Sequence, residues 1–273
     1  MVNQKNIQRK FPHNSKAFTS VQKLVVDGVV TKDRKVMADA LNNHFVDKVH
    51  NLVANMPPQS SDILATLLAT PNPPGNELQL MELTIQKLDK YIRSMKKNSS
   101  SGIDSISGRI LNDVYESTKR IILHIINLSM CLGIFPTLFK LTKITPILKA
   151  CKNQLDPASY RPVANLCSVG KLLEAAVMDQ VKNHLVKNNF WNNNQHGSRV
   201  KHSTTTCVCE ILEDSNKANE KGLMTAVTAV DMSSAFDLID HKVLIQKCRI
   251  ALIGNAGLTW LIDFLDNWSQ MVM

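Results

Sequence analysis

The segment Val227–His241 reads VTAVDMSSAFDLIDH and places three aspartates and a histidine directly after an apolar run. Its small and β-branched residues predict a buried strand over Leu223–Val230, with Asp231 at the carboxyl end. A sheet holds such a carboxylate rigidly at a cleft, so we interpret Asp231 as a ligand for a hard divalent cation. A helix is expected from about Asp237, and we interpret Asp237 and Asp240 as caps of that helix.

The chain carries an excess of positive charge. Among 273 residues, 32 are Lys or Arg and 23 are Asp or Glu, which gives a net charge of +9. The hydrophobic share of 44% fits a soluble globular protein with a sizeable core. The charge favours an anionic partner, most commonly nucleic acid, although a basic protein without such a partner remains an alternative.

The cysteines and the apolar runs indicate in which cellular compartment the protein is expected. Six cysteines form no C-x-x-C pair and no signal peptide is present, so we expect free thiols and an intracellular protein, nuclear or cytoplasmic and not secreted. Cys207, Cys209 and His202 lack a second ligand pair at zinc-finger spacing, so we do not predict zinc. The longest apolar helix candidate, Ile121–Leu132, is too short to span a bilayer, so no membrane partner is expected.

The sequence suggests four regions. Residues 1–20 are predicted to be a disordered basic tail, and residues 57–80 a proline-rich linker. Between them, residues 21–56 predict a hairpin that turns at Asp27-Gly28. An amphipathic helix follows, with a repeated apolar position every four residues: Met37, Leu41, Phe45, Val49 and Val53.

Residues 81–273 form the fourth region, in which helix signals dominate. We expect capped helices that start after Thr84, Ser168 and Ser203, and a long helix from Gly108 to Leu132 that stops at Gly133. Thr142–Lys149 reads as a short strand or extended segment, and the stretch through Pro157 and Pro162 reads as irregular. The predicted fold class is therefore an α-rich α/β protein.

Four motifs then resemble one family in order. Asp231–His241, D-x-S-x-A-F-D-x-x-D-H, resembles motif A of reverse transcriptases from non-LTR (LINE-type, jockey-like) retrotransposons. Ser99–Leu111, Gly133–Val177 and Gln195–Thr206 resemble the family's G-x-D-G-I-P opening, its P-I-x-K…Y-R-P-I fingers segment and its Q-F-G-F-R-x-x-H-S-T motif. Asp27–Val49 is similar to the part that precedes the polymerase. The resemblance runs from about Gly28 to the end of the chain.

The resemblance implies a right-hand polymerase fold, with fingers and a partial palm sheet over 81–273 and with the thumb and later palm motifs absent. It implies an RNA-directed DNA polymerase, a nucleotidyltransferase that uses two Mg²⁺ ions. Its partners would be an RNA template, a DNA primer and deoxynucleoside triphosphates. In this family the motif A aspartate and the next backbone carbonyl bind metal, and these are Asp231 and Met232 here.

The same resemblance assigns roles to five further residues. Phe236 would exclude the 2′-hydroxyl of a ribonucleotide, with a core aromatic as the alternative. Lys149 and Arg161 would bind the triphosphate, with ordinary solvated surface charges as the alternative. Arg199 and Lys201 would contact the template or primer backbone.

Two departures from the family pattern matter. His196 and Ser198 stand where the family has aromatic residues, which leaves the packing of that loop open. No A-D-D or Y-x-D-D sequence occurs among the 273 residues. Because one carboxylate cannot hold two Mg²⁺ ions, we expect this chain alone to be inactive, with exposed strand edges and apolar surface. The alternative function is a catalytically dead fragment that binds RNA.

Overall fold

A computed structural model describes residues 21–55, 61–71, 77–97, 100–232 and 234–273. The predicted tail at 1–20 and parts of the predicted linker, 57–60 and 72–76, lie outside the described residues. The chain divides into two compact units: a large unit of residues 1–181 and 237–273, and a small unit of residues 182–236. In the described part of the chain, no helix has the length and apolarity needed to cross a membrane.

The large unit begins with the predicted hairpin and helix. Strands β1 (Leu24–Val26) and β2 (Val29–Thr31) pair antiparallel. Asp27 and Gly28 between them have φ of 50° and 79°, the positive values that a two-residue hairpin turn of type I′ requires. Helix α1 (Arg34–Ala54) follows, and the Asp33 side chain accepts hydrogen bonds from the first-turn amides, as an N-cap does. The predicted hairpin and helix are both present; Met37, Leu41 and Phe45 of the predicted apolar face are buried, whereas Val53 is 54% exposed.

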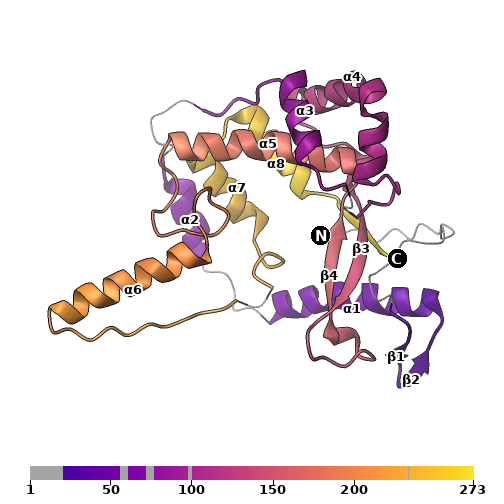
Figure 1. The fold of residues 1–273 in the computed structure, drawn as a ribbon, viewed down its shortest axis with the longest axis horizontal. Helices are drawn as coiled ribbons and strands as arrows, with labels where there is room; N and C mark the ends of the chain where they lie inside the picture. The colour runs from indigo at the N-terminus through magenta and orange to yellow at the C-terminus, as the bar shows by residue number, and fades with distance from the viewer. Residues whose placement is uncertain (1–20, 56–60, 72–76, 98–99, 233) are drawn as a thin grey trace. The chain divides into compact units, whose positions relative to one another are not determined.

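A three-stranded sheet forms the second part of this unit. Its order is β4 (Tyr160–Asn165), β3 (Leu141–Leu148) and β5 (Ser269–Val272); β3 pairs antiparallel with β4 and parallel with β5. One face of this sheet shares a core with α1 and β1 (Figure 1), and the buried members of that core are Leu24, Met37, Leu41, Phe45, Ile144, Tyr160 and Val272.

Strand β4 corrects the expectation of an irregular stretch through Pro162. The register places Pro162 opposite Pro146. The Lys149 amide donates to the Ser159 carbonyl at 2.9 Å, and bonded pairs alternate along an antiparallel ladder, so the two prolines meet at a pair that exchanges no hydrogen bonds. The missing N–H of Pro146 faces the β5 side, where β5 pairs only as far as Ile144. Neither proline removes a bond from the ladder.

Helices cover the rest of the large unit, with α3 and α8 packed on α4, and α2 and α8 packed on α7 (Figure 1). Thr84 caps α3, and Gly133 ends α4 in the left-handed conformation, with φ of 67°, as predicted. The elements are α2 (Ser61–Ala69), α3 (Ile85–Ser94), α4 (Gly108–Leu132), η1 (Thr137–Lys140), η2 (Pro157–Ser159), α5 (Ser168–Lys187, which runs into the small unit), α7 (His241–Ile250) and α8 (Asn255–Leu265).

The start of α5 differs from the expected Ser168 cap. Ser168 is the first helical residue, and its hydroxyl donates to the Ile106 carbonyl at 2.7 Å. The Cys167 Sγ instead accepts from the Gly170 amide at 3.3 Å. A Cβ on Gly102 would lie 2.5 Å from the Cys167 nitrogen, so only glycine allows the loop before α4 to approach this closely. Burial raises the pKa of the Cys167 thiol to about 11, which keeps it protonated.

A buried ion pair joins α8 to the start of β3. The Lys140 side chain is 5% exposed; its Nζ lies 3.0 Å from Asp263 Oδ2 and donates to the Asp263 carbonyl at 2.6 Å. The same Oδ2 accepts from the Phe135 amide at 2.7 Å. The Phe135 ring contacts Trp260 and Phe264 edge-on, with centroids 5.5 and 5.1 Å away. The Asp263 carboxylate, whose side chain is 35% exposed, therefore satisfies the buried Lys140 ammonium and the Phe135 amide at the edge of an aromatic core.

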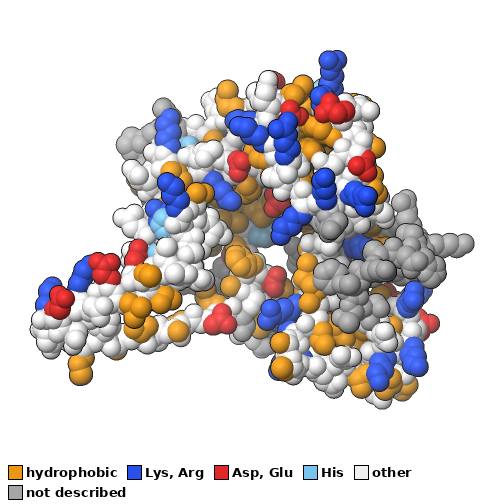
Figure 2. Space-filling view, in the orientation of Figure 1, with side chains coloured by type: hydrophobic (Ala, Val, Ile, Leu, Met, Phe, Trp, Pro, Cys, Tyr) orange, Lys and Arg blue, Asp and Glu red, His pale blue; other side chains and the backbone are white. Residues whose placement is uncertain are grey.

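The small unit has no comparable core. It contains the end of α5, a loop, helix α6 (Thr204–Glu220) and the segment after it. Ser203 caps α6 in a capping box with Thr206, as predicted. Among the described residues of this unit no hydrophobic side chain is buried. Figure 2 shows hydrophobic side chains at the surface of this unit, and the exposed hydrophobic residues on α6 include Val208, Ile211 and Leu212.

We predict that Asp263→Ala destabilises the chain by about 3–5 kcal/mol, because it leaves the Lys140 charge and the Phe135 amide with fewer partners in the core. The double variant Lys140→Met with Asp263→Asn should recover most of that loss, since an apolar side chain replaces the ammonium and the amide oxygen still accepts from Phe135. Urea unfolding measures both.

The control is Glu116→Ala, which breaks the exposed Lys119–Glu116 pair at 2.6 Å and should cost less than about 1 kcal/mol. Equal losses for Asp263→Ala and Glu116→Ala would show that burial gives the Lys140–Asp263 pair no special weight.

Candidate active site

Lys149 and Arg161 lie on one face of the sheet. The register pairs Ile147 with Arg161 and ends at Leu148 and Tyr160; just beyond the strand, the Lys149 amide donates to the Ser159 carbonyl, which continues the pairing by one residue. Directly opposed residues share a face, and residues two apart on a strand share it too, so Lys149 and Arg161 project from the same side. Ile144 and Tyr160 lie on the other side, in the core with α1. One face of the β3–β4 ladder is therefore apolar and covered, and the opposite face carries the two predicted phosphate-binding cations.

The two cations differ in their surroundings. Lys149 is half-buried, and its Nζ donates to the Ala158 carbonyl at 2.6 Å, which holds the ammonium over the turn between the strands. Arg161 is exposed. Lys149 is thus fixed in place, whereas the guanidinium of Arg161 is accessible to an anion, to which it can donate two parallel hydrogen bonds.

Sequence reasoning missed a third cation on this face, Lys143. Its pair is Asn165, whose amide donates to Thr145 Oγ1 at 3.0 Å on the same face. The signal was present in TKITPILK, where Lys143 and Lys149 are an even number of residues apart and so share a face of any strand. The even spacing alone could not show which side of the strand is exposed, because that requires strand β4 and its pairing with β3, which the sequence did not predict.

The opening segment does not form the predicted buried strand. Residues 223–232 have no regular secondary structure and are all exposed, with Val227 at 66% and Val230 at 84%. A strand needs a partner for its backbone groups, and the described part of the small unit contains no other strand. The expectation that a sheet holds Asp231 is therefore wrong for this structure.

Asp231 and Met232 lie in this exposed segment, and Phe236 lies in the turn that follows it. The Phe236 ring is 91% exposed, so the alternative of a core aromatic does not apply to this structure. The following helix α7 begins later than expected, and the Asp240 side chain accepts from the Val243 amide at 3.0 Å. Asp240 is thus a helix cap as predicted, whereas Asp237 precedes the helix and does not cap it.

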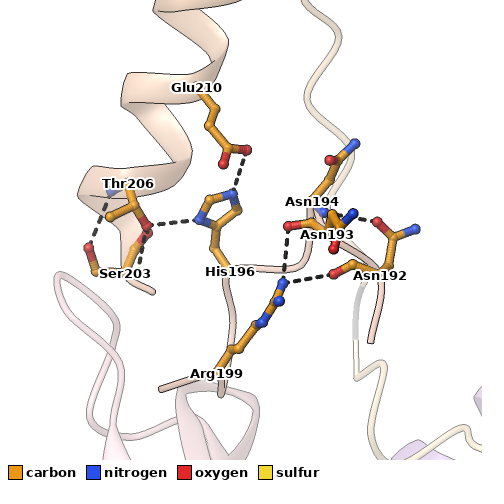
Figure 3. Close-up of polar contacts among 8 residues, drawn as sticks. All are labelled: Asn192, Asn193, Asn194, His196, Arg199, Ser203, Thr206 and Glu210. Carbon is orange, nitrogen blue, oxygen red and sulfur yellow. Dashed lines mark hydrogen bonds and ion pairs between the residues drawn. The ribbon is translucent and has the colours of Figure 1, made fainter. Parts of the chain in front are cut away.

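Arg199 and Lys201 lie on the loop before α6. The Arg199 Nη1 donates to the carbonyls of Asn192 and Asn193 at 3.0 and 3.1 Å (Figure 3), which leaves other guanidinium N–H groups for a phosphate. Lys201 is exposed. His196, in place of the family's aromatic residue, is buried and hydrogen-bonded to α6, so the loop packs through polar contacts.

The donors near motif A suit Mg²⁺ in kind but not in number. A carboxylate at Asp231 and a carbonyl at Met232 are the oxygen ligands that Mg²⁺ prefers. Within the described ranges, no group of three or more His, Cys, Asp or Glu side chains is arranged to hold a metal ion. All six cysteines are free thiols, as expected.

The predicted site residues fall into two sets. Lys149 and Arg161 share a face of the large unit, whereas the other five residues, Arg199, Lys201, Asp231, Met232 and Phe236, belong to the small unit. The first set lies on the β3–β4 ladder, and the second lies on the loop before α6 and on the segment after it.

Comparison with known proteins identifies the segment that contains both sets. Residues 149–269 match the family model described as reverse transcriptase (RNA-dependent DNA polymerase). This segment of the chain is therefore similar to reverse transcriptases. The match starts at Lys149 and includes every residue predicted from the motifs.

The relatives agree with this assignment. "Probable RNA-directed DNA polymerase from transposon BS" of Drosophila melanogaster is 24% identical over 81% of this chain and 24% of its own length. The RNA-directed DNA polymerases from mobile element jockey of Drosophila funebris and Drosophila melanogaster are 26% and 24% identical, over 77% and 63% of this chain and 23% and 19% of theirs. The chain thus spans about a quarter or less of the curated relatives it matches.

We predict that chymotrypsin cuts first within residues 223–236, because residues 223–232 are exposed and lie outside any helix or strand, and Phe236 is 91% exposed; the sites are Leu223, Met224 and Phe236. Exposed Leu128 and Leu132 provide internal controls, since both lie in helix α4 and should be cut later. Mass spectrometry of a timed digest identifies the sites. A single resistant product from about Leu83 to Met273 would contradict the prediction.

Proposed function

We propose that this chain supplies the fingers and the motif A segment of an RNA-directed DNA polymerase, which acts on an RNA template, a DNA primer and deoxynucleoside triphosphates. The observation that carries the proposal is the shared face of Lys149 and Arg161, opposite the face that packs on α1. A triphosphate needs cations that converge from one side, and the shared face of Lys149 and Arg161 supports this condition.

In this proposal the two cations act differently. Lys149 is held by the Ala158 carbonyl and acts as a fixed point charge. Arg161 is exposed and donates in a bidentate manner to phosphate oxygens. Together they orient the triphosphate and neutralise part of its charge. Lys143 extends the same face and contributes a further positive charge toward an anionic strand.

The small unit supplies the second half of the proposal. Asp231 and the Met232 carbonyl would hold Mg²⁺, and the bound metal would supply the positive charge that nucleotidyl transfer needs. The exposed Phe236 ring would lie under the incoming sugar and exclude a 2′-hydroxyl. Arg199 and Lys201 would contact the nucleic-acid backbone. We also propose that residues 21–56 form a separate piece before the polymerase, that residues 57–80 are a linker, and that residues 81–273 form the partial polymerase domain.

A second candidate function is RNA binding without catalysis. It is favoured by the absence of a carboxylate cluster in the described ranges and of an A-D-D sequence in the 273 residues. The net charge of +9 supports affinity for RNA in either case.

We predict that Arg161→Ala weakens binding of a fluorescent deoxynucleoside triphosphate by about tenfold or more, since a hydrogen bond to a charged group contributes about 1.5–3 kcal/mol. Arg161→Lys should lie in between, because it keeps the charge and loses the bidentate geometry. Lys90→Ala, an exposed cation on α3, is the control and should change affinity little. Equal effects of Arg161→Ala and Lys90→Ala would show that the β3–β4 face has no special role.

We predict that the 273-residue chain incorporates no deoxynucleotide in a primer-extension assay on an RNA template, because a single motif A carboxylate holds too little of a two-ion site. RNA binding should still fall steeply with salt. Incorporation that disappears in Asp231→Ala would contradict the prediction of inactivity and would favour a competent site.

A further inference from the structure

His196 occupies a position that its contacts, rather than hydrophobic packing, hold in place. Its side chain is 7% exposed, in a unit whose described hydrophobic side chains are all at least partly exposed. Nε2 lies 2.9 Å from Glu210 Oε2, and Nδ1 lies 2.8 Å from Thr206 Oγ1 (Figure 3). Both partners project from α6, so the histidine joins its loop to the first two turns of that helix.

The contacts of Thr206 select one protonation state of His196. Thr206 Oγ1 accepts from the Ser203 amide at 2.9 Å and lies 2.9 Å from the Ser203 carbonyl. A hydroxyl has one hydrogen, which must serve either the Ser203 carbonyl or the imidazole Nδ1. If Nδ1 carries a proton, it donates to Thr206 and the hydroxyl hydrogen goes to Ser203. If Nδ1 has none, one of these two bonds is lost.

The contact with Glu210 requires a proton on the other ring nitrogen, because a carboxylate only accepts. Only the imidazolium form has an N–H at both nitrogens, so only this form completes all the contacts that the geometry offers. Its charge is also attracted to the Glu210 carboxylate, which is 53% exposed and therefore contributes a moderate, salt-dependent energy.

The bonds of His196 act on the loop that carries the proposed nucleic-acid contacts. Arg199 follows three residues later and binds the carbonyls of Asn192 and Asn193, which precede His196 (Figure 3). The loop is thus closed on itself by Arg199 and attached to α6 by His196. Ser198 and Lys201 within it have positive φ, of 58° and 64°, conformations that a loop released from α6 would not be expected to keep.

We propose that His196 is a positioning residue: a pH-dependent latch that fastens the loop of residues 192–202 to α6 through Thr206 and Glu210, and thereby sets Arg199 and Lys201 for contact with a nucleic-acid backbone. The second part rests on the function proposed above. The latch closes when both ring nitrogens of His196 carry a proton and loosens when one of these protons is lost.

Two titratable groups face His196. Glu210 on α6 favours the charged ring, and His202 on the loop opposes it, since the two ring centroids are 5.2 Å apart. His202 Nδ1 lies 3.0 Å from the Val200 carbonyl, which already requires its proton there. A second charge on His202 would repel His196, so the latch is strongest when only His196 is charged.

The experiment compares Glu210→Gln with Glu213→Gln in the full chain. Both changes remove one negative charge from α6, but Glu213 pairs with Lys217 and not with the histidine. Amide exchange of residues 195–207, corrected for intrinsic rates, is measured at pH 6 and pH 8. The affinity for a fluorescent single-stranded RNA is measured under the same conditions. His196→Phe, His202→Gln and the double variant Arg199→Ala with Lys201→Ala complete the set.

The latch predicts about two- to fivefold greater protection at pH 6 than at pH 8, which Glu210→Gln and His196→Phe abolish and Glu213→Gln keeps. RNA affinity at pH 6 should fall by a similar factor in Glu210→Gln relative to Glu213→Gln. Matching exchange in Glu210→Gln and Glu213→Gln at both pH values would overturn the latch. The latch would also be overturned if the pH dependence of amide exchange disappeared in His202→Gln but remained in Glu210→Gln.

The double variant separates this inference from the proposed function. If Arg199→Ala with Lys201→Ala binds RNA as well as the wild type, the proposed backbone contacts are wrong, and the exchange data alone then decide whether the latch exists.

Discussion

The Lys140–Asp263 pair fixes the relation between helix α8 and the central strand of the sheet. A buried ammonium must have a partner, and Asp263 supplies both a carboxylate and a carbonyl to it. Because β3 begins directly after Lys140 and β5 follows α8, this pair brings the two strands together at Leu141 and Ser269. A sheet has a side-chain period of two, so a slip of one residue in β3 would turn Lys149 toward α1. The open basic face depends on this register.

The two units are stabilised in different ways. The large unit buries apolar side chains from helices and strands in two core clusters. The small unit keeps its order through caps and side-chain hydrogen bonds: the capping box at Ser203 and Thr206, the bonds of Arg199 to loop carbonyls and the contacts of His196. Such contacts each contribute little in water and respond to protonation, whereas apolar burial does not. The unit that contains Asp231 is therefore the one more open to its surroundings.

The sequence predicted well the helix ends that are determined by hydrogen bonds within a single turn. Asp33, Thr84 and Ser203 begin helices, and Gly133 ends one, because each of these residues satisfies backbone groups within its own turn. Strand β4 was missed because its two-proline pairing is tolerated only in a particular register with β3, which is a non-local property.

The opposite error occurred over residues 223–230. Their composition is that of a strand, yet a strand exists only where another can pair with it, and none is present in the described part of the small unit. For the candidate site, residue types and motif order pointed to Lys149 and Arg161, but their common face, and Lys143 beside them, required the register of β3 and β4. The side-chain partners of His196 were equally beyond sequence patterns, because they depend on how the loop folds back on α6.

Pro162 has a consequence for the outer side of the sheet. It sits on β4, an edge strand, at a pair whose backbone groups point away from β3. Proline has no N–H, so the outer edge of β4 lacks a hydrogen-bond donor at residue 162. A strand from another molecule therefore cannot form a continuous ladder along this edge. Pro162, which made this strand read as irregular in the sequence, thus also protects the folded chain against pairing of β4 with a strand of another molecule.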